Sequence, residues 1–367
     1  MILTRGQEKA LSGRLGPAKG WAMEVLCRIG DDRGSSRLLP VHSVHISDWR
    51  SNLRSEAWEH LLSVGSAVHA TANPGGPPHD RDAVEKALVL EQLSSARIYT
   101  CTCAPHLVGN HPSVGGVVAW GGRAAGAYAN SVLGVRSAAE TFESAVASAI
   151  IGLTPERGIL VEESRRPTVA VTVAEHIDRD HALLGWLISQ EVPGEVPVIC
   201  GIAPDHGEAK RLAFSLNHDG RTPLFSISRN GPPPGLEQVS IPASAWDIVD
   251  ACDGESIDLV IMGYPHMSEQ DINRWGRLMN GGRMPSVESW FFTSRLCADK
   301  SPATSSILRA MGRLFTDMCP LSAIDHLRQR SVGCDSPGLA ECLRQAGVKA
   351  RYLPHQTLRR ILAPDRE

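Results

Sequence analysis

Short runs of apolar residues alternate along this chain with longer segments whose apolar residues recur at helical spacing. The strand-like runs cover residues 35–43, 67–70, 168–173, 197–202, 223–227 and 257–262. Helical spacing is clearest over residues 56–64, 81–93, 137–151 and 268–279. Because strands that alternate with helices are typical of parallel sheets, the pattern predicts the α/β fold class.

The length of the chain indicates more than one domain. Its 367 residues, 42% of them hydrophobic, suffice for about two or three cores. The pattern breaks at residues 165–167, and the Pro-rich stretch 231–235 is predicted to be a loop because proline and glycine resist helices and ladders. We expect N-terminal α/β domains over residues 1–166, a middle α/β domain over 167–250 and a C-terminal α/β region over 251–367.

Charge and composition exclude several classes of partner. Lys and Arg total 37 against 40 Asp and Glu, so no positive field favours nucleic acid or an anionic membrane surface. No run of about 20 apolar residues occurs, and the first residues lack the order of a signal peptide. We therefore expect a cytoplasmic protein. Nine cysteines, an odd number, fit a reducing compartment, so clustered thiols are candidate ligands or nucleophiles.

Common catalytic signatures are absent from the sequence. It contains no phosphate-binding P-loop, no H-E-x-x-H zinc helix, no G-x-S-x-G elbow and no C-x-x-C pair. Residues 99–137 instead combine thiols, imidazoles, glycines and aromatic side chains. This region is the predicted location of a site.

Four motifs stand out in and just after this region: T-C-A-P at 102–105, A-W at 119–120, A-N-S-V-L-G at 129–134, and Gly152 followed by T-P at 154–155. Their order and spacing resemble the core signature of the aconitase X family. Weaker similarities extend over most of the chain, at His45-Ile46, Asn73, D-H-A-L-L-G at 180–185, G-Y-P-H at 263–266 and D-M-C at 317–319.

The resemblance implies an aconitase-superfamily fold, in which three-layer α/β/α domains surround a central cleft that a swivelling domain closes. This chain lacks the glycine- and serine-rich motif of that domain, so we expect a small partner subunit to supply it. Family members dehydrate small hydroxylated acids such as cis-3-hydroxy-L-proline or mevalonate 5-phosphate. They use an iron–sulfur cluster or a single iron ion held by cysteines.

The predicted metal ligands are Cys103 and Cys319. Elimination of water needs an acid to neutralise the departing hydroxide, and thiolates suit iron. We expect iron or a [2Fe-2S] cluster, with a divalent ion such as Mg²⁺ as the alternative. Cys101 would share a face with Cys103 on a strand, although a core thiol is the more ordinary interpretation. Cys334 is a reserve ligand.

The sequence departs from the family at several of these positions. Tyr264 replaces the cysteine of G-C-P-H, and Gly121-Gly122-Arg123 replaces an acid after A-W. Ser336-Pro337-Gly338 lacks the lysine of a family turn, whereas Arg136 is kept and could grip an anion through two hydrogen bonds.

The remaining candidates fall into two groups. Catalytic roles are predicted for His45, His106, Tyr264 and His266. Substrate binding is predicted for Asn73, Arg123, Asn130, Ser131 and Arg136. Structural roles are the alternative for each imidazole, and Asn130 could instead cap a helix.

Three functions remain open from the sequence. The leading hypothesis is an iron-dependent hydro-lyase that works with a small subunit. The second is a repurposed relative acting on another anionic substrate, phosphorylated or carrying a diphosphate, without an iron–sulfur cluster. The third is a noncatalytic subunit that keeps only the fold and the partner surface.

Overall fold

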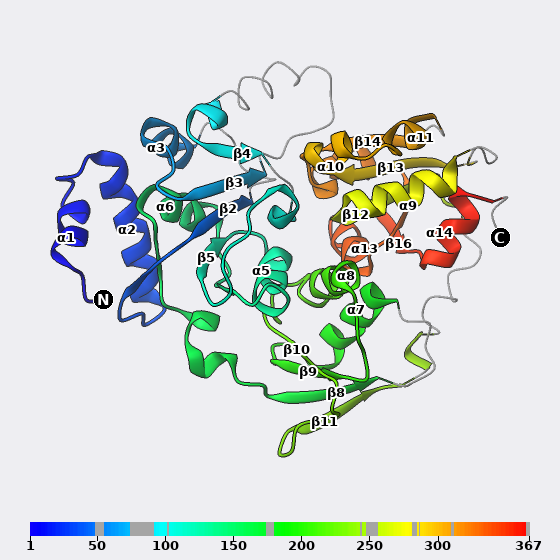
Figure 1. The fold of residues 1–367 in the computed structure, drawn as a ribbon, viewed down its shortest axis with the longest axis horizontal. Coiled ribbons are helices and arrows are strands. Elements are labelled where there is room, and N and C mark those ends of the chain that lie inside the picture. Colours follow the sequence, from blue (N-terminus) through cyan, green and yellow to red (C-terminus); the bar gives the residue numbers. More distant parts are fainter. Residues whose placement is uncertain are drawn as a thin grey trace.

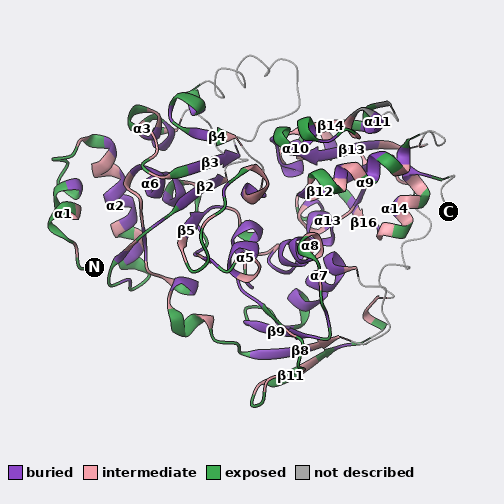
Figure 2. Cartoon of the chain, viewed as in Figure 1, coloured by how far each residue is buried: buried purple, intermediate pink, exposed green. Residues whose placement is uncertain are grey.

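The fold was analysed in a computed structural model of the chain (Figure 1). The structure describes residues 1–47, 55–73, 92–100, 103–173, 180–242, 244–246, 256–280, 285, 287–309 and 312–364. Each of its three larger sheets is wholly parallel, which confirms the predicted α/β class. Figure 2 shows that most strands are buried, whereas those at residues 226–228 and 237–241 are largely exposed, and that the outer helices keep exposed faces.

The first sheet has the strand order β4-β3-β2-β5-β6. Its strands are β2 (Ser43–Ser47), β3 (His69–Asn73), β4 (Ile98–Thr100), β5 (Val117–Trp120) and β6 (Arg136–Ser137). A separate antiparallel pair joins β1 (Leu38–Pro40) to β7 (Leu153–Pro155). The associated helices are α1 (Arg5–Leu11), α2 (Pro17–Asp32), α3 (Glu56–Val64), α5 (Arg123–Ser131) and α6 (Phe142–Ile151). Short 3-10 turns are η2 (Pro105–Val108), η3 (Gly158–Leu160) and η4 (Glu162–Arg165).

The second sheet has the order β10-β9-β8-β11. Its strands are β8 (Val169–Val173), β9 (Pro197–Cys200), β10 (Ser226–Ser228) and β11 (Glu237–Ile241), and its helices are α7 (His181–Glu191) and α8 (His206–Leu216). The two helices pack so closely that a Cβ on Gly185 would lie 2.4 Å from the Leu212 carbonyl oxygen. Only glycine permits this approach.

The third sheet has the order β14-β13-β12-β15-β16. Its strands are β12 (Leu259–Met267), β13 (Glu288–Thr293), β14 (Gly312–Thr316), β15 (Ser331–Cys334) and β16 (Lys349–Tyr352). The helices are α9 (Glu269–Met279), α10 (Arg295–Lys300), α11 (Thr304–Arg309), α12 (Ile324–Leu327), α13 (Pro337–Gln345) and α14 (His355–Leu362), and η6 (Pro320–Ala323) is a 3-10 turn. One face of the sheet packs against α13 and the other against α9 and α14, which gives an α/β/α sandwich.

Helix α8 lies where the three sheets meet. It packs against α5 of the first sheet's helices, against α7 beside the second sheet, and against α13 and β12 of the third. It therefore contacts elements that belong with each of the three sheets. Figure 1 shows α8 in the middle of the molecule. A side chain on this helix can therefore reach residues that are distant in sequence.

The predicted elements were correct where their periodicity was strongest. Residues 56–64 form α3, residues 268–279 form α9 with Ser268 as its N-cap, and residues 231–235 are a loop. The helix predicted over residues 137–151 was wrong at its start, because Ser137 belongs to β6 and Thr141 caps α6. Most of the predicted helix 81–93 lies outside the described residues.

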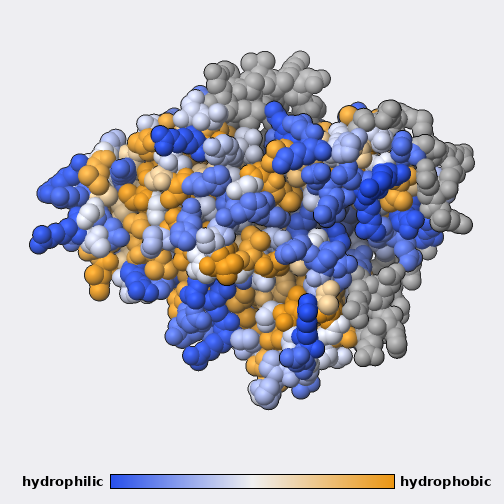
Figure 3. Space-filling model, viewed as in Figure 1, coloured by the Kyte–Doolittle hydropathy of each residue, from blue (hydrophilic) through white to orange (hydrophobic). Residues whose placement is uncertain are grey.

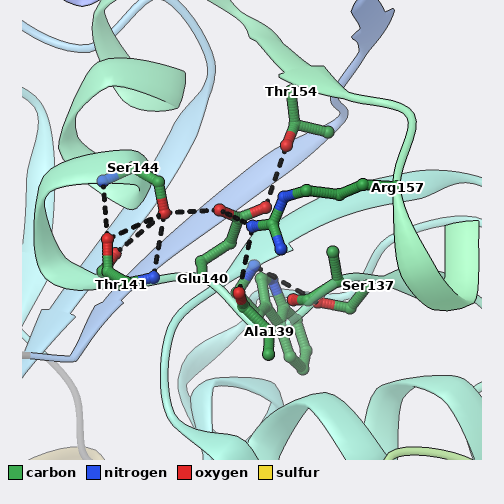
Figure 4. Close-up of polar contacts among 9 residues, drawn as sticks. Ser137, Ala139, Glu140, Thr141, Ser144, Thr154 and Arg157 are labelled. Carbon is green, nitrogen blue, oxygen red and sulfur yellow. Dashed lines mark hydrogen bonds and ion pairs between the residues drawn. The ribbon is translucent and has the colours of Figure 1, made fainter. Parts of the chain in front are cut away.

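A buried ion pair fixes the beginning of α6 (Figure 4). The Glu140 carboxylate accepts hydrogen bonds from Ser144 Oγ at 2.5 Å, Thr154 Oγ1 at 2.8 Å and the Arg157 guanidinium at 2.8 Å. Arg157 also donates to the Ala139 carbonyl at 3.0 Å. Thr154, part of the recognised T-P motif, therefore supports the fold by joining β7 to α6.

Candidate functional site

The carboxyl ends of the first and third sheets face one another, and two predicted site residues meet there. Cys103 follows β4 and His266 lies near the end of β12, with Cys103 Sγ 3.6 Å from His266 Nδ1. The carboxyl edge is where ligands bind in open parallel sheets. A contact across 163 positions of sequence thus defines the centre of the candidate site.

His266 has a defined tautomer. Its Nε2 lies 2.6 Å from the Met318 carbonyl oxygen, which can only accept, so Nε2 must carry the proton. Burial lowers the pKa of His266 to about 3, and the ring is therefore neutral. Its Nδ1 is then an acceptor aimed at the Cys103 thiol, which donates to it.

Cys319 is brought to the same place by a tight turn after β14. Asp317 adopts a left-handed backbone conformation with φ 57°, which aspartate tolerates better than most residues. Its carboxylate accepts from the Arg295 backbone N–H at 3.0 Å. This turn presents both the Met318 carbonyl to His266 and the Cys319 thiol at the start of η6.

Both thiols are protonated in this environment. Burial raises the pKa of Cys103 to about 11, against the opposing effects of His266 and Lys210. Burial, followed by the neighbouring Cys103, raises the pKa of Cys319 further. A metal ion at this site must therefore displace the thiol protons as it binds.

The donor set fits a single iron ion better than a cluster held by three thiolates. Cys103 and Cys319 provide two soft ligands, and the third family position is Tyr264. No group of three or more His, Cys, Asp or Glu side chains in the described part of the chain is arranged to hold a metal. Cys101 lies outside the described residues, and Cys334 is the last residue of β15 and is buried in the core.

Tyr264 is a neutral phenol close to the thiols. Burial, and then the thiols of Cys342 and Cys319, raise its pKa well above the ordinary value. Its ring meets Phe214 of α8 edge to face, with centroids 6.4 Å apart. It can donate a hydrogen bond to an anion.

Asp335 forms hydrogen bonds with the backbone of the turn that carries Tyr264 and His266. This carboxylate, directly after β15, accepts from the backbone N–H groups of Gly263 at 2.7 Å and Tyr264 at 3.4 Å. Gly263 has φ 106°, and a Cβ there would lie 2.3 Å from the Phe292 carbonyl oxygen. Burial raises the pKa of Asp335 to about 7.

Lys210 holds the same turn from the opposite side. Its ammonium group, on α8, donates to the His266 carbonyl at 2.8 Å and lies 3.4 Å from Asp271 Oδ2. Only 3% of Lys210 is exposed, so a positive charge is kept inside the protein beside the thiol–imidazole pair. Such a charge attracts anions strongly because water does not screen it.

His45 is the middle residue of β2 and lies near His266. Its Nδ1 is 3.1 Å from Thr71 Oγ1, which donates to the Val44 carbonyl and accepts from Asn110, so His45 Nδ1 must be the donor. Burial lowers the pKa of His45 to about 3. The ring is neutral, and its Nε2 carries a lone pair.

His106 stacks on Tyr128, with centroids 4.4 Å apart. Burial, and then the charge of Lys210, lower its pKa to about 3. Its buried Nδ1 has no hydrogen-bond partner among the described residues. This polar atom could bind a substrate group.

Two of the predicted substrate-binding residues lie near this centre. Asn73 is buried at the carboxyl end of β3, in register with Ser47. Arg123 begins α5, lies close enough to Tyr264 to lower its pKa, and donates to the Asp219 carbonyl at 2.8 Å.

The other three are engaged elsewhere in the fold. Asn130 donates to the Ser137 carbonyl at 2.9 Å and accepts from the Ser137 N–H at 2.8 Å, while Ser131 Oγ accepts from the Phe225 N–H at 2.9 Å. Arg136 forms an ion pair with Glu162. Their contacts hold β6, α5 and the second sheet together, so their predicted substrate roles stay predictions.

Sequence reasoning missed Lys210 and Asp335. Both gave a signal: Lys210 follows Ala209 on a helix whose apolar residues include Leu212 and Ala213, and Asp335 directly follows a buried strand. Charged side chains at such positions are rare unless they have a partner.

Comparisons with known proteins give consistent results. Residues 1–163 match the family model described as the aconitase X first domain. The chain is 30% identical over 386 residues to the phosphomevalonate dehydratase large subunit of Methanothermobacter thermautotrophicus, covering 96% of each chain. It is 27% identical over 353 residues to the cis-3-hydroxy-L-proline dehydratase of Pseudomonas aeruginosa, covering 84% of this chain and 60% of that one. The crystal structure of Thermococcus kodakaraensis aconitase X in its holo form superposes with a TM-score of 0.87 at 26% identity, over 99% of this chain and 100% of that chain.

Proposed function

This chain belongs to the aconitase X family, and on that premise we propose that it is the large subunit of a hydro-lyase that removes water from a small hydroxylated acid. The observation that supports the proposal most directly is the contact of Cys103 with His266 beside Cys319, at the facing edges of two sheets. The two thiols are 216 positions apart in sequence, and the Cys103 thiol lies close enough to Cys319 to affect its pKa.

We propose Cys103 and Cys319 as the residues that hold an iron ion. When bound there, iron would supply the Lewis acid that neutralises the charge of the departing hydroxide. His266 Nδ1 accepts a hydrogen bond from the Cys103 thiol and so orients it. Because the pKa of His266 is about 3, the thiol proton that must leave before the sulfur can act as a ligand has to pass to solvent. Lys210 favours the thiolate that results, since its charge lowers the pKa of Cys103.

The hydrogen-bond donors and positive charges around this centre suit recognition of an anion. Tyr264 can donate to a carboxylate, and Lys210 and Arg123 provide positive charge. His45, His106 and His266 each have a pKa of about 3, which makes them weak bases at neutral pH. The base that removes the carbon-bound proton is therefore assigned to a partner subunit.

The comparisons support such a partner. The relative named as a large subunit is matched over 96% of its length, whereas the proline dehydratase is matched over only 60%. A phosphorylated hydroxy acid such as phosphomevalonate is accordingly the first substrate to test, and cis-3-hydroxy-L-proline the second.

The test is anaerobic purification of the chain with a co-expressed small subunit, followed by measurement of iron, acid-labile sulfide and dehydration of both acids. We expect about one iron per chain without sulfide, and loss of that iron in Cys103→Ala and Cys319→Ala. Cys297→Ala, which removes a buried thiol near α9, is the matched control and should keep its iron.

Two results would contradict the proposal. A wild-type complex without iron would remove the metal centre. Equal iron loss in the Cys297 control and in the two site variants would show that thiol removal only disturbs folding. Stoichiometric sulfide would overturn the single-ion assignment while leaving the hydro-lyase intact.

A further inference from the structure

Helices α9 and α14 border a cavity on the outer face of the third sheet. Its volume is about 360 Å³, and it is lined by Arg274, Arg277 and Leu278 of α9 and Arg359 of α14. This size lies at the lower end of the range for small-molecule sites. Three of the four lining side chains are guanidinium groups.

The apolar sides of both helices explain why these arginines face outward. Trp275 and Met279 of α9 and Leu358 and Leu362 of α14 pack against the sheet in one hydrophobic cluster. The residues between them must then point away from the sheet. Figure 3 shows a strongly hydrophilic surface over α9 and α14.

Two of the three guanidinium groups that line this cavity, those of Arg274 and Arg277, differ in their ion pairing from other arginines on the third sheet. Arg328, Arg330 and Arg344 each form an ion pair with a carboxylate. Within the described residues Arg274 and Arg277 form none, and no carboxylate lines the cavity. Residues three apart on a helix are neighbours, so these two like charges repel one another, and an anion between them would relieve that repulsion.

His355 packs between the two helices, close to Arg274. Its ring spans the two helices by packing on Trp275, with centroids 5.1 Å apart. Burial, and then the charges of Arg274 and Arg211, lower its pKa to about 4. Its Nε2 is buried and has no hydrogen-bond partner among the described residues. A neutral imidazole beside several guanidinium groups is compatible with an anion and unsuited to a cation.

We propose that the α9–α14 cavity binds a small phosphorylated anion, at a site distinct from the thiol–imidazole centre. Guanidinium groups match phosphate oxygens through paired hydrogen bonds, and Leu278 offers an apolar wall for a short organic part. The site lies on the face of the sheet beyond the layer formed by Trp275 and Met279, whereas Cys103 and His266 meet at its carboxyl edge. It is independent of the proposed dehydration chemistry.

Calorimetric titration of the full chain with inorganic pyrophosphate at low ionic strength tests this site. We expect one equivalent to bind to the wild-type protein, and the Arg274→Gln/Arg277→Gln double variant to weaken binding at least tenfold. Arg359→Gln should weaken binding as well, because the cavity needs both helices. Inorganic phosphate, with less charge, should bind more weakly than pyrophosphate.

The matched control is Arg328→Gln/Arg344→Gln, which removes the same charge from exposed ion pairs. It should bind pyrophosphate as the wild-type protein does. Equal weakening in both double variants would show a general charge effect and overturn the site. Absence of binding to the wild-type chain, or unchanged binding in the α9 variant with native circular dichroism, would overturn it too.

Discussion

Lys210 is the single residue with the widest influence on the candidate site. Its charge lies beside Cys103, His106 and His266 and alters the pKa of each. A buried ammonium group is costly unless it is hydrogen-bonded, and here the His266 carbonyl and Asp271 offset that cost. The effect of this charge is therefore best tested at the Cys103 thiol, whose pKa it lowers.

Lys210→Met is expected to slow alkylation of Cys103 by iodoacetamide at least threefold at pH 9. The thiolate is the reactive form, and loss of the neighbouring positive charge raises the thiol pKa. The rate is followed by mass spectrometry of the Cys103 peptide, with Cys27 as the internal reference. Lys210→Arg should keep most of the wild-type rate. A uniform change at both cysteines would indicate loosening of the fold instead.

Individual site residues were predictable to the extent that local motifs mark them. Cys103, His266 and Cys319 belong to recognisable motifs, and the structure brings them together. Lys210 and Asp335 bind backbone atoms of a turn that is distant in sequence. The only mark of such a contact in the sequence is a charged residue at a position where a buried residue is expected. Spacing within the chain carries no information on those partners.

At the scale of elements, the turn between β12 and α9 depends on three other elements. Asp335 after β15 and Lys210 on α8 bind its backbone, and the Met318 carbonyl after β14 fixes the ring of His266. Periodicity predicted α3 and α9 well because their apolar stripes are local. It could not predict which strands pair, because the register depends on residues far apart in sequence.

Some residues of the recognised family motifs join helices and strands, and among the described residues they form no hydrogen bond with the thiol–imidazole pair. Thr154 joins β7 to the Glu140–Arg157 pair, and Asn130 ties α5 to β6. Motif similarity alone could not separate these architectural positions from ligand positions, since both are specified by neighbours that only the fold supplies.

Glu140→Gln is expected to destabilise the protein by about 3 kcal/mol, since it leaves the Arg157 charge buried without its partner. The cost is measured as the change in free energy of unfolding in urea. Glu143→Gln, an exposed position on the same helix, is the control and should cost about 0.5 kcal/mol or less. Equal costs at the two positions would contradict a special role for the buried network.

For the whole molecule, the three parallel sheets and the match to an aconitase X structure confirm the predicted family and fold. The predicted domain limits stay predictions. No helix in the described residues is long and apolar enough to cross a bilayer. The site lies between sheets, so its buried imidazoles couple the stability of the whole chain to pH.

His45 and His266 are fully buried and have pKa values of about 3, against about 6.5 in an unfolded chain. Between those values the unfolded state binds more protons than the folded state. Each imidazole therefore makes the protein less stable as pH falls from about 6.5, by about 1.4 kcal/mol per pH unit. Asp335, whose pKa is raised to about 7, contributes with the opposite sign.

His45→Asn isolates one of these contributions, because Asp335 and the other imidazoles are the same in both proteins. Asparagine can still donate to Thr71 in place of Nδ1. Urea unfolding between pH 7 and 5 should show that stability falls less steeply in the variant, by about 1.4 kcal/mol per pH unit below pH 6. The two curves should run parallel above pH 7, where His45 is neutral in both states. Parallel curves throughout would mean that His45 gains its proton at the same pH in the folded and the unfolded protein, and the neutral, hydrogen-bonding site proposed around it would have to be abandoned.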